Sequence, residues 1–469
     1  MIEMSTIVSQ NQMLNECLAQ AQEQAEQDPS RPMFHFRAPA QWMNDPNGTI
    51  YHNGYYHLFY QFNPYQAKWG QIHWGHARSR DLVHWEHLPI ALTPSAELGE
   101  EHCFSGCAYL GEQQTPILFY TSIGRRLPEQ WAAVGDTDWI AWQKIAENPF
   151  LKMADHHGIH VEDWRDPFVF QAGERTFMTL GGKIAHDSVA VIYEKGKDAF
   201  SWTYQGVLFR HPDAALHSLE CPNFFPLGDK WVLLDSPYGP VDCFIGDFDL
   251  ETLNFTPESQ HLADYSKQFY ATNLYHDDNG RWILVGWIRD FEQPRGWNGC
   301  LSLPRELSIG ADGRLRQRPI PGLQQLRGEH FRIEAEELSK SRRIAMRMPG
   351  QQAEIFGQFD LRDARIFSLN IGHASDEQPA LAISYDGRTL DVAGIAVPLS
   401  LAEDRHLLTL HIFIDRSVME VFVNNGRACV TRVVALPDDA AITLFADGAA
   451  NVAQFELWEM RAIWPPARE

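Results

Sequence analysis

The chain has 469 residues, which is too long for one ordinary hydrophobic core and predicts two domains. Its hydrophobic content of 44% and its charged content of 21% are typical of a globular protein. The formal net charge of -22 argues against nucleic acid and anionic membranes as partners, because phosphate backbones need a basic face, although a few local Arg or Lys side chains could still hold a phosphorylated substrate.

The N-terminal segment contains no basic stretch followed by an apolar run, so no signal peptide is predicted. No window of about 18 consecutive apolar residues predicts a transmembrane helix. The seven cysteines form no paired CxxC framework and are expected to be free thiols in a reducing compartment. We therefore expect a cytoplasmic protein.

Residues 1–30 are rich in Gln, Glu and Ala and predict a helical extension. Leu14, Leu18 and Ala21 have helical spacing, and Asp28-Pro29 ends the run. The extension packs either on the body of the protein or on a partner chain, and a frayed tail is the alternative. This helix and an exposed sheet edge could each support a homo-oligomer.

Residues 31–318 alternate short aromatic and β-branched runs with turn residues, which predicts β-hairpins. Four of the five expected hairpins have compact turns, at Asn53-Gly54, Ala172-Gly173, Gly228-Asp229 and Asn279-Gly280. The fifth, over 108–122, has a looser turn. Five similar modules favour a five-bladed β-propeller.

A short polar motif directly precedes each hairpin, and the motifs recur about every 53 to 61 residues. They are Asn44-Asp45, Phe104-Ser105, Arg165-Asp166, Glu220-Cys221 and Thr272-Asn273. In a propeller the innermost strands line a central axis, so polar residues at equivalent points converge at one mouth of that axis.

Two prolines, Pro319 and Pro321, introduce an expected linker over 319–334. From 335 to 469 the polar/apolar alternation resumes, with turns at Asp386-Gly387 and Asn425-Gly426, and predicts an antiparallel β-sandwich. The expected fold class is therefore all-β, a five-bladed propeller followed by a sandwich and preceded by a short helix.

Three acidic motifs stand in turn-forming contexts: WMNDPNG (42–48), WRDP (164–167) and ECP (220–222). Glycoside hydrolysis needs two carboxylates in different protonation states on either side of the scissile bond. Taken singly, Asp45 could be a turn residue, Glu220 a strand-end cap, and Arg165-Asp166 a buried ion pair.

These motifs, in this order, resemble glycoside hydrolase family 32, which contains invertases, fructan hydrolases and sucrose-6-phosphate hydrolases. The similarity extends from about Arg31 over nearly the whole chain and includes YHLFYQFNP, WGQIHWGHARSRDLVHWEHLPIAL, FSG and IFIDRSVMEVFVNNGRA. The resemblance implies a retaining β-fructofuranosidase that cleaves sucrose or short fructo-oligosaccharides without a cofactor.

The resemblance also implies roles for individual residues. Asp45 would be the nucleophile, Glu220 the acid/base and Asp166 a stabiliser of the transition state. Arg165 would hold the carboxylates and tune Glu220. Other positions match sugar contacts of the family: Asn44, Gln61, Trp69, Phe104, Ser105, Tyr270 and Trp287.

The chain departs from the family pattern at Cys107, where many members have Ser, and at Gln268 and Thr272-Asn273, near the leaving-group side. Sucrose-6-phosphate hydrolase and fructosyltransferase activities therefore stay open. Candidate phosphate-binding cations are Lys68, Arg125 and Arg126.

Two other functions are compatible with parts of the sequence: an inverting arabinosidase-like enzyme and a non-catalytic sugar-binding protein. The attached sandwich argues against the first, and the presence of all three acids argues against the second. Histidines cluster in HWGH (73–76) and DHHGIH (155–160), but no Cys/His/carboxylate set has metal-ligand spacing, so no metal is assigned.

Overall fold

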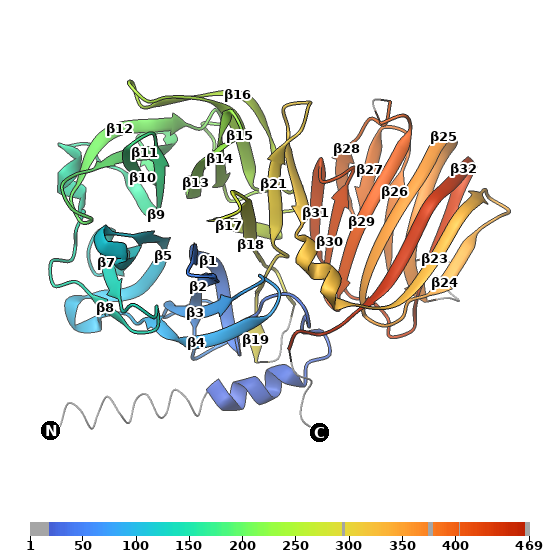
Figure 1. Cartoon of the computed structure of the whole chain (residues 1–469), viewed down its shortest axis with the longest axis horizontal. Coiled ribbons are helices and arrows are strands. Elements are labelled where there is room, and N and C mark those ends of the chain that lie inside the picture. Colours follow the sequence, from blue (N-terminus) through green and yellow to red (C-terminus); the bar gives the residue numbers. More distant parts are fainter. Residues whose placement is uncertain (1–17, 293–295, 374–378, 403, 465–469) are drawn as a thin grey trace.

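The computed structural model describes residues 18–292, 296–373, 379–402 and 404–464. Five small sheets stand around a common axis, and a larger β-structure lies beside them (Figure 1). The predicted all-β class, with a five-bladed propeller and a sandwich, is confirmed. None of the described helices is both long and apolar enough to cross a membrane.

The first three blades are antiparallel sheets of four consecutive strands each. Blade one contains β1 (Gln41–His52), β2 (Tyr55–Asn63), β3 (His73–Ser79) and β4 (Trp85–Leu92). Blade two contains β5 (Glu100–Leu110), β6 (Pro116–Gly124), β7 (Glu129–Gly135) and β8 (Trp142–Lys144). Blade three contains β9 (Glu162–Ala172), β10 (Arg175–Ile184), β11 (Asp187–Lys195) and β12 (Trp202–Arg210). Short 3-10 turns η1 (Ala96–Leu98), η2 (Glu112–Gln114) and η3 (Met153–His156) lie in or between blades.

The last two blades complete the ring. Blade four contains β13 (Glu220–Leu227), β14 (Lys230–Ser236), β15 (Asp242–Asp249) and β16 (Asn254–Leu262). Blade five contains β17 (Phe269–His276), β18 (Trp282–Ile288), β20 (Cys300–Leu301), β21 (Arg305–Ile309) and β22 (Leu315–Pro319). A segment from the end of the ring, β19 (Trp297–Asn298), pairs in parallel with β1 through Gln41 and Trp42, so blade five is tied to blade one.

The hairpin turns follow the local sequence closely. Asn53 and Gly54 both have positive φ angles, 50° and 78°, and they connect the paired residues His52 and Tyr55. A two-residue turn of this kind matches the right-handed twist of its strands, and Asn-Gly is the pair that adopts it at least cost.

The sandwich begins inside the range expected to be a linker. A 3-10 turn, η4 (Pro321–Leu326), follows β22, and β23 (Arg327–Leu338) pairs with the last strand of the domain. Most residues of β23 are exposed and polar, so this strand lacks the polar/apolar alternation of the strands that follow it.

Two long strands, β25 (Gln352–His373) and β32 (Ala440–Met460), form the centre of the sandwich and pair along most of their length. The remaining strands are β24 (Ile344–Arg347), β26 (Leu381–Tyr385), β27 (Thr389–Val392), β28 (Ile395–Pro398), β29 (Leu407–Asp415), β30 (Val418–Val423) and β31 (Ala428–Val433). Alternate residues such as Ile355, Leu369 and Leu444 face one apolar core, as the period of two requires.

Residues 18–26 are helical, and the helix packs on the body of the protein. Ala21 and Ala25 are buried, and Ala25 belongs to an apolar cluster that includes Trp297. Asp28, just after the helix, accepts a hydrogen bond from the Trp297 indole at 2.9 Å. The part of the predicted extension over 1–17, including Leu14, lies outside the described residues.

A buried ionic network joins the propeller to the sandwich. The His35 ring lies 2.8 Å from an Asp415 oxygen and 3.0 Å from a Glu420 oxygen. Arg305 of blade five pairs with Glu420 at 2.5 Å and with Asp264 at 3.1 Å. All these side chains are fully buried, so removing one partner would leave a charge without compensation.

Candidate active site

Five inner strands, β1, β5, β9, β13 and β17, bring the five polar motifs to the propeller axis. The pairing of each strand with its neighbour is irregular beside its motif: between Met43 and Pro46, for example, and between Glu220 and Asn223. Such bulges re-aim side chains. Asp166 and Cys221 also have positive φ angles of 63° and 48°, which turn them toward the axis.

The space along the axis beneath these motifs is nearly closed. It amounts to a cavity of about 10 Å³, lined from all five blades by residues that include Ser105, Pro167, Asn223 and Asn273. Asn273 holds two of the inner strands together, because its amide donates to the Pro46 carbonyl at 3.1 Å. The motif side chains therefore lie on a solid base rather than over an open channel.

Asp45 receives N–H or O–H hydrogen bonds from three side chains, in addition to a longer contact from the Cys221 thiol. Ser105 donates to its Oδ2 at 2.5 Å, Gln61 donates to the same oxygen at 3.2 Å, and Asn44 donates to Oδ1 at 3.0 Å. Burial raises the pKa of the Asp45 carboxyl and the Ser105 hydrogen bond opposes this, while the charge of Glu220 adds to the rise. The donors favour the carboxylate, the form that a nucleophile requires.

Asp166 lies next to Asp45 and is connected to it through Cys221. The Cys221 amide donates to Asp166 Oδ2 at 3.0 Å, and its Sγ lies 3.6 Å from an oxygen of each aspartate. Burial raises the pKa of Asp166 to about 7, against the opposing charge of Arg165 at 3.8 Å. Two acids so close together interact strongly, so their titrations belong to the cluster.

Glu220 is held at both carboxyl oxygens. Arg165 lies 2.5 Å from Oε1, and the Tyr238 hydroxyl donates to the same oxygen at 3.1 Å. The Tyr270 hydroxyl lies 2.5 Å from Oε2 and 2.9 Å from the Ser236 carbonyl. The Glu220 side chain is 19% exposed, so it faces the mouth of the site rather than its base.

The predicted aromatic positions surround this mouth. Trp69 is 51% exposed, and its ring lies 4.9 Å from His102 and 6.2 Å from Phe104. On the other side Trp287 packs edge-on against Trp42 at 5.6 Å. Exposed ring faces at the rim of a polar pocket suit the apolar faces of a sugar.

Two residues contribute to the site although the sequence assigned neither of them a role. Cys221 touches both aspartates, and Tyr238 contacts Glu220 and Arg165 while leaving 48% of its surface exposed. Tyr238 has a φ of 63° in the loop after β14, and its amide donates to the Tyr270 hydroxyl at 3.0 Å. The surrounding Pro-Tyr-Gly-Pro sequence predicts a loop, but nothing local in it predicts that the ring reaches a carboxylate.

The proposed phosphate-binding cations lie on exposed loops. Arg125 approaches Glu101 at 4.0 Å, Arg126 approaches Glu129 at 3.6 Å, and Lys68 is exposed beside Trp69. The histidine motifs are used in packing: the His156 ring lies 2.5 Å from the Tyr193 hydroxyl, and burial lowers the pKa of His76.

One group of potential metal ligands lies away from the acids, where His211, Asp235 and Asp242 approach within 4.8 Å of one another. The His211 Nδ1 accepts a backbone hydrogen bond from Asp213 at 3.1 Å, so the neutral ring carries its proton on Nε2. That nitrogen lies 3.3 Å from Asp242 and acts as a donor to it rather than as a metal ligand.

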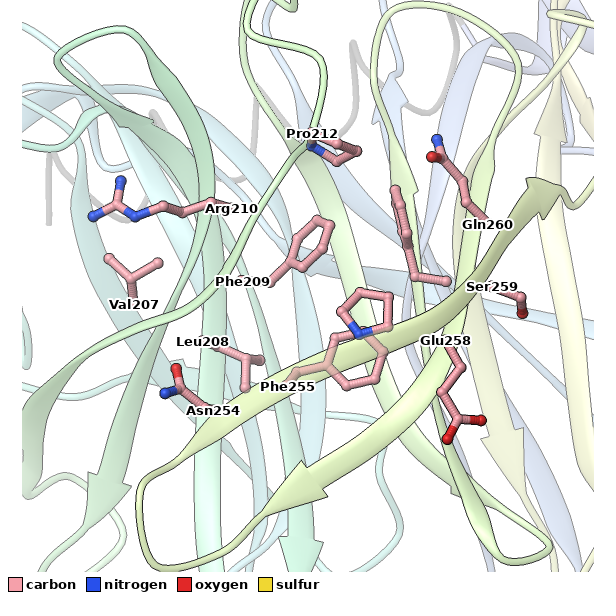
Figure 2. A pocket seen from close by; sticks show the side chains of 12 residues that line it. Val207, Leu208, Phe209, Arg210, Pro212, Asn254, Phe255, Glu258, Ser259 and Gln260 are labelled. Atoms are coloured by element: carbon pink, nitrogen blue, oxygen red, sulfur yellow. The ribbon is translucent and has the colours of Figure 1, made fainter.

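A groove of about 490 Å³ lies beside this group, between the outer strands β12 and β16 (Figure 2). Phe209 and Phe255 line it, together with Arg210, Glu258 and Gln260. None of the candidate catalytic residues contributes to the groove. The chemistry is therefore expected at the mouth of the propeller axis, where the three acids lie, and not in this groove.

Comparisons with known proteins agree over most of the chain. The model of the "Glycosyl hydrolases family 32 N-terminal domain" matches residues 35–319, and that of the "Glycosyl hydrolases family 32 C terminal" matches residues 322–459. A sucrose-6-phosphate hydrolase of Escherichia coli is 32% identical over 92% of this chain and 94% of its own length. A raffinose invertase of Escherichia coli is 30% identical over 91% of this chain and 94% of its own length.

Solved structures show the same similarity. A mutant of the Bombyx mori beta-fructofuranosidase in complex with sucrose superposes with a TM-score of 0.83 at 28% identity. The similarity covers 97% of this chain and 99% of that one.

Proposed function

The chain belongs to glycoside hydrolase family 32, and from this premise we propose that Asp45, Asp166 and Glu220 together cleave the β-fructosyl bond of sucrose-type sugars with retention of configuration. The protein is a glycoside hydrolase of the β-fructofuranosidase type. The observation that carries the assignment of roles is the meeting of three acids from three different blades around the Cys221 sulfur and the Arg165 guanidinium.

In the first step the Asp45 carboxylate attacks the anomeric carbon of the fructosyl unit, and the bond to the leaving sugar breaks. Glu220 gives its proton to the glycosidic oxygen, which leaves as a hydroxyl group. The result is a fructosyl ester on Asp45. Ser105, Gln61 and Asn44 support this step because each donates to the carboxylate and holds it in one orientation.

In the second step water replaces the leaving sugar. Glu220, now a carboxylate, takes a proton from the water, whose oxygen attacks the anomeric carbon and releases Asp45. The Tyr270 hydroxyl suits both protonation states of Glu220. It can donate to the Glu220 carboxylate, or it can donate to the Ser236 carbonyl and accept from the protonated acid.

Asp166 does not need to form a bond. Asp166 is buried beside Asp45, with 6% of its surface exposed. There it can hold fructose hydroxyls and stabilise the positive charge that develops on the sugar ring. The Cys221 amide and the Arg165 side chain fix its orientation. Arg165 also contacts Glu220, so the two carboxyls keep a constant relative position.

The substrate class follows from the relatives. The bacterial relatives are named sucrose-6-phosphate hydrolase and raffinose invertase, and the Bombyx mori structure holds sucrose. We infer sucrose, its 6-phosphate or short fructo-oligosaccharides as substrates. Initial rates of free fructose release from sucrose, sucrose 6-phosphate and 1-kestose, measured side by side, rank them directly.

The roles are tested with Glu220→Gln on two substrates. Loss of a general acid/base lowers the turnover of sucrose by about 10²–10⁴-fold. Fructosyl transfer to Asp45 from a fructoside with an acidic phenol leaving group needs no proton, so a burst of phenol equal to the enzyme concentration should persist. Glu194→Gln is the matched control, because Glu194 is a half-buried glutamate of blade three that pairs with Arg175 at 2.7 Å, away from the three acids. Equal losses on both substrates, without a burst, would remove Glu220 from the acid/base role.

A further inference from the structure

We propose that the cleft between the propeller and the sandwich is a second binding site, which holds a phosphate group, free or carried on a small sugar. The cleft has a volume of about 400 Å³, within the range of small-molecule pockets, and such pockets occur preferentially at domain interfaces. Its lining is Tyr265 and Arg314 from the propeller and Gly387, Arg388, Pro398, Leu399, Ser400, Arg427 and Ala428 from the sandwich.

Three guanidinium groups gather in this one cleft of a chain whose net charge is -22. Among the residues that the structure describes, Arg314 and Arg388 form no ion pair, and both are exposed. Arg427 is held by Asp312 at 3.3 Å and by Asp404 at 3.4 Å. Planar guanidinium donors match the oxygens of a phosphate better than any other side chain does.

The acids near the cleft are already engaged. Asp312 receives the side chain of Arg316 at 2.7 Å in addition to that of Arg427. Asp404 also accepts from Asn424 at 2.7 Å. Asp386 accepts two backbone amides of its own turn, from Arg388 at 2.9 Å and from the residue after it at 2.8 Å. Among the described residues none of these carboxylates forms an ion pair with Arg314 or Arg388, although the charge of Asp386 acts on Arg388, so the donors of both guanidiniums remain for an anion.

The walls of the cleft are fixed by direct contacts between the domains. The Gln317 amide donates to the Gly426 carbonyl at 3.1 Å, and the Tyr265 amide donates to the Cys429 carbonyl at 2.9 Å. Gly426 packs so closely that a Cβ there would lie 1.8 Å from the Gln317 carbonyl oxygen. A site that is held in place before binding loses less freedom when the ligand arrives.

The remaining lining suits a sugar attached to the phosphate. Tyr265, Pro398 and Leu399 provide apolar surface, and Ser400 offers a hydroxyl on the exposed side. The site is separate from the three acids. It lies at the turn between β21 and β22, the outer strands of blade five, whereas the acids lie on inner strands at the axis.

The test is calorimetric titration of the whole protein with glucose 6-phosphate, inorganic phosphate and glucose. We expect one saturable site for a phosphate-bearing probe, and no binding of glucose at this site. The double variant Arg314→Ala/Arg388→Ala should lose at least tenfold in affinity, because it removes two cations that contact the phosphate. A control with the same change in net charge is Arg332→Ala/Arg362→Ala, whose side chains are exposed elsewhere on the sandwich.

The rate of fructose release from sucrose separates this site from the active site and from its proposed function, because Arg314→Ala/Arg388→Ala should keep the wild-type rate while it loses phosphate binding. Tighter binding of glucose 6-phosphate than of phosphate assigns a sugar phosphate as ligand, and equal binding assigns free phosphate. The proposal is overturned if neither phosphate-bearing probe binds, if the arginine variant binds as the wild type does, or if fructose competes with the bound probe.

Discussion

Replacing Ser105 with alanine tests how the nucleophile keeps its charge. The Ser105 hydroxyl donates to Asp45 Oδ2 at 2.5 Å, closer than Asn44 at 3.0 Å or Gln61 at 3.2 Å. It is also the strongest of the contacts that oppose the rise in the pKa of Asp45 caused by burial. Without this donor the carboxylate is less stable, so the pKa of Asp45 rises further.

The size of the effect follows from the cost of one hydrogen bond to a charged group, about 1.5–3 kcal/mol. One pKa unit corresponds to about 1.4 kcal/mol, so the shift is about one to two units. Gln61 loses its own 2.5 Å contact with Ser105 and can turn fully to Asp45, which places the expectation near the lower value. The acid limb of kcat/KM should therefore move about one unit to higher pH.

The assay is the initial rate of fructose release from sucrose at low substrate concentration, across the pH range of the wild type. Ser188→Ala is the control, because Ser188 is also buried but donates to the Leu216 carbonyl in blade three. A rate that falls by the same factor at every pH, with the limb unmoved, would show that Ser105 does not tune the charge of Asp45.

Three further changes test the fold. His35→Gln breaks the buried network and should lower the free energy of unfolding by about 3–5 kcal/mol. Burial alone would lower the pKa of His35, but Asp415 and Glu420 outweigh it and raise the pKa to about 9. The contribution of His35 is therefore full below about pH 6.5 and is lost as the pH rises toward 9. Asp235→Asn should raise the free energy of unfolding at pH 7 by about 1.4 kcal/mol or more, the value of one pKa unit. Burial and the charge of Asp242 raise the pKa of the Asp235 carboxyl, whose oxygens have no hydrogen-bond partner in the described structure. This gain in stability should vanish as the pH falls toward 4. Gly426→Ala should cost about 2 kcal/mol or more, because φ is 78° and the new Cβ would meet Gln317.

Denaturant unfolding at several pH values measures all three. Gly280→Ala is the control for Gly426, since its φ of 73° is similar but nothing lies within 4 Å of the added Cβ. For His35 a loss that does not change between pH 6 and 9 would contradict the role of its charge. For Asp235 a destabilised variant at pH 7 would mean that the carboxyl has a partner after all.

Local sequence determined much of the architecture. Asn-Gly and Gly-Asp pairs specify tight hairpins at Asn53-Gly54 and Gly228-Asp229, because few other residues adopt their backbone angles, and the structure has turns at both places. Alternation with a period of two then indicates which strand residues are buried. The recurrence of hairpins at similar spacing predicted the propeller and the convergence of the five polar motifs, whereas the roles of individual residues were implied by the resemblance to the family.

The strand inside the expected linker and the contact of Tyr238 with Glu220 could not be predicted from local sequence patterns. The segment Arg327–Leu338 is a strand because β32 offers it a partner, although its own residues are mostly polar and exposed. Tyr238 reaches Glu220 because its own backbone adopts the left-handed conformation, which turns its loop back toward Tyr270 of blade five. Neither partner lies near in sequence, so no local pattern records the contact.

The sequence by itself determined which residues are acidic, where the chain turns and which fold the repeats build. Only the tertiary structure decided that an irregularity beside each motif aims Asp45, Asp166 and Glu220 at one point. The physical reason is that hydrogen bonds along the chain follow from a few neighbouring residues, whereas the charge state of each carboxyl depends on burial and on groups some 50 or more positions away. These groups come close to the carboxyls only when the five blades have closed into a ring.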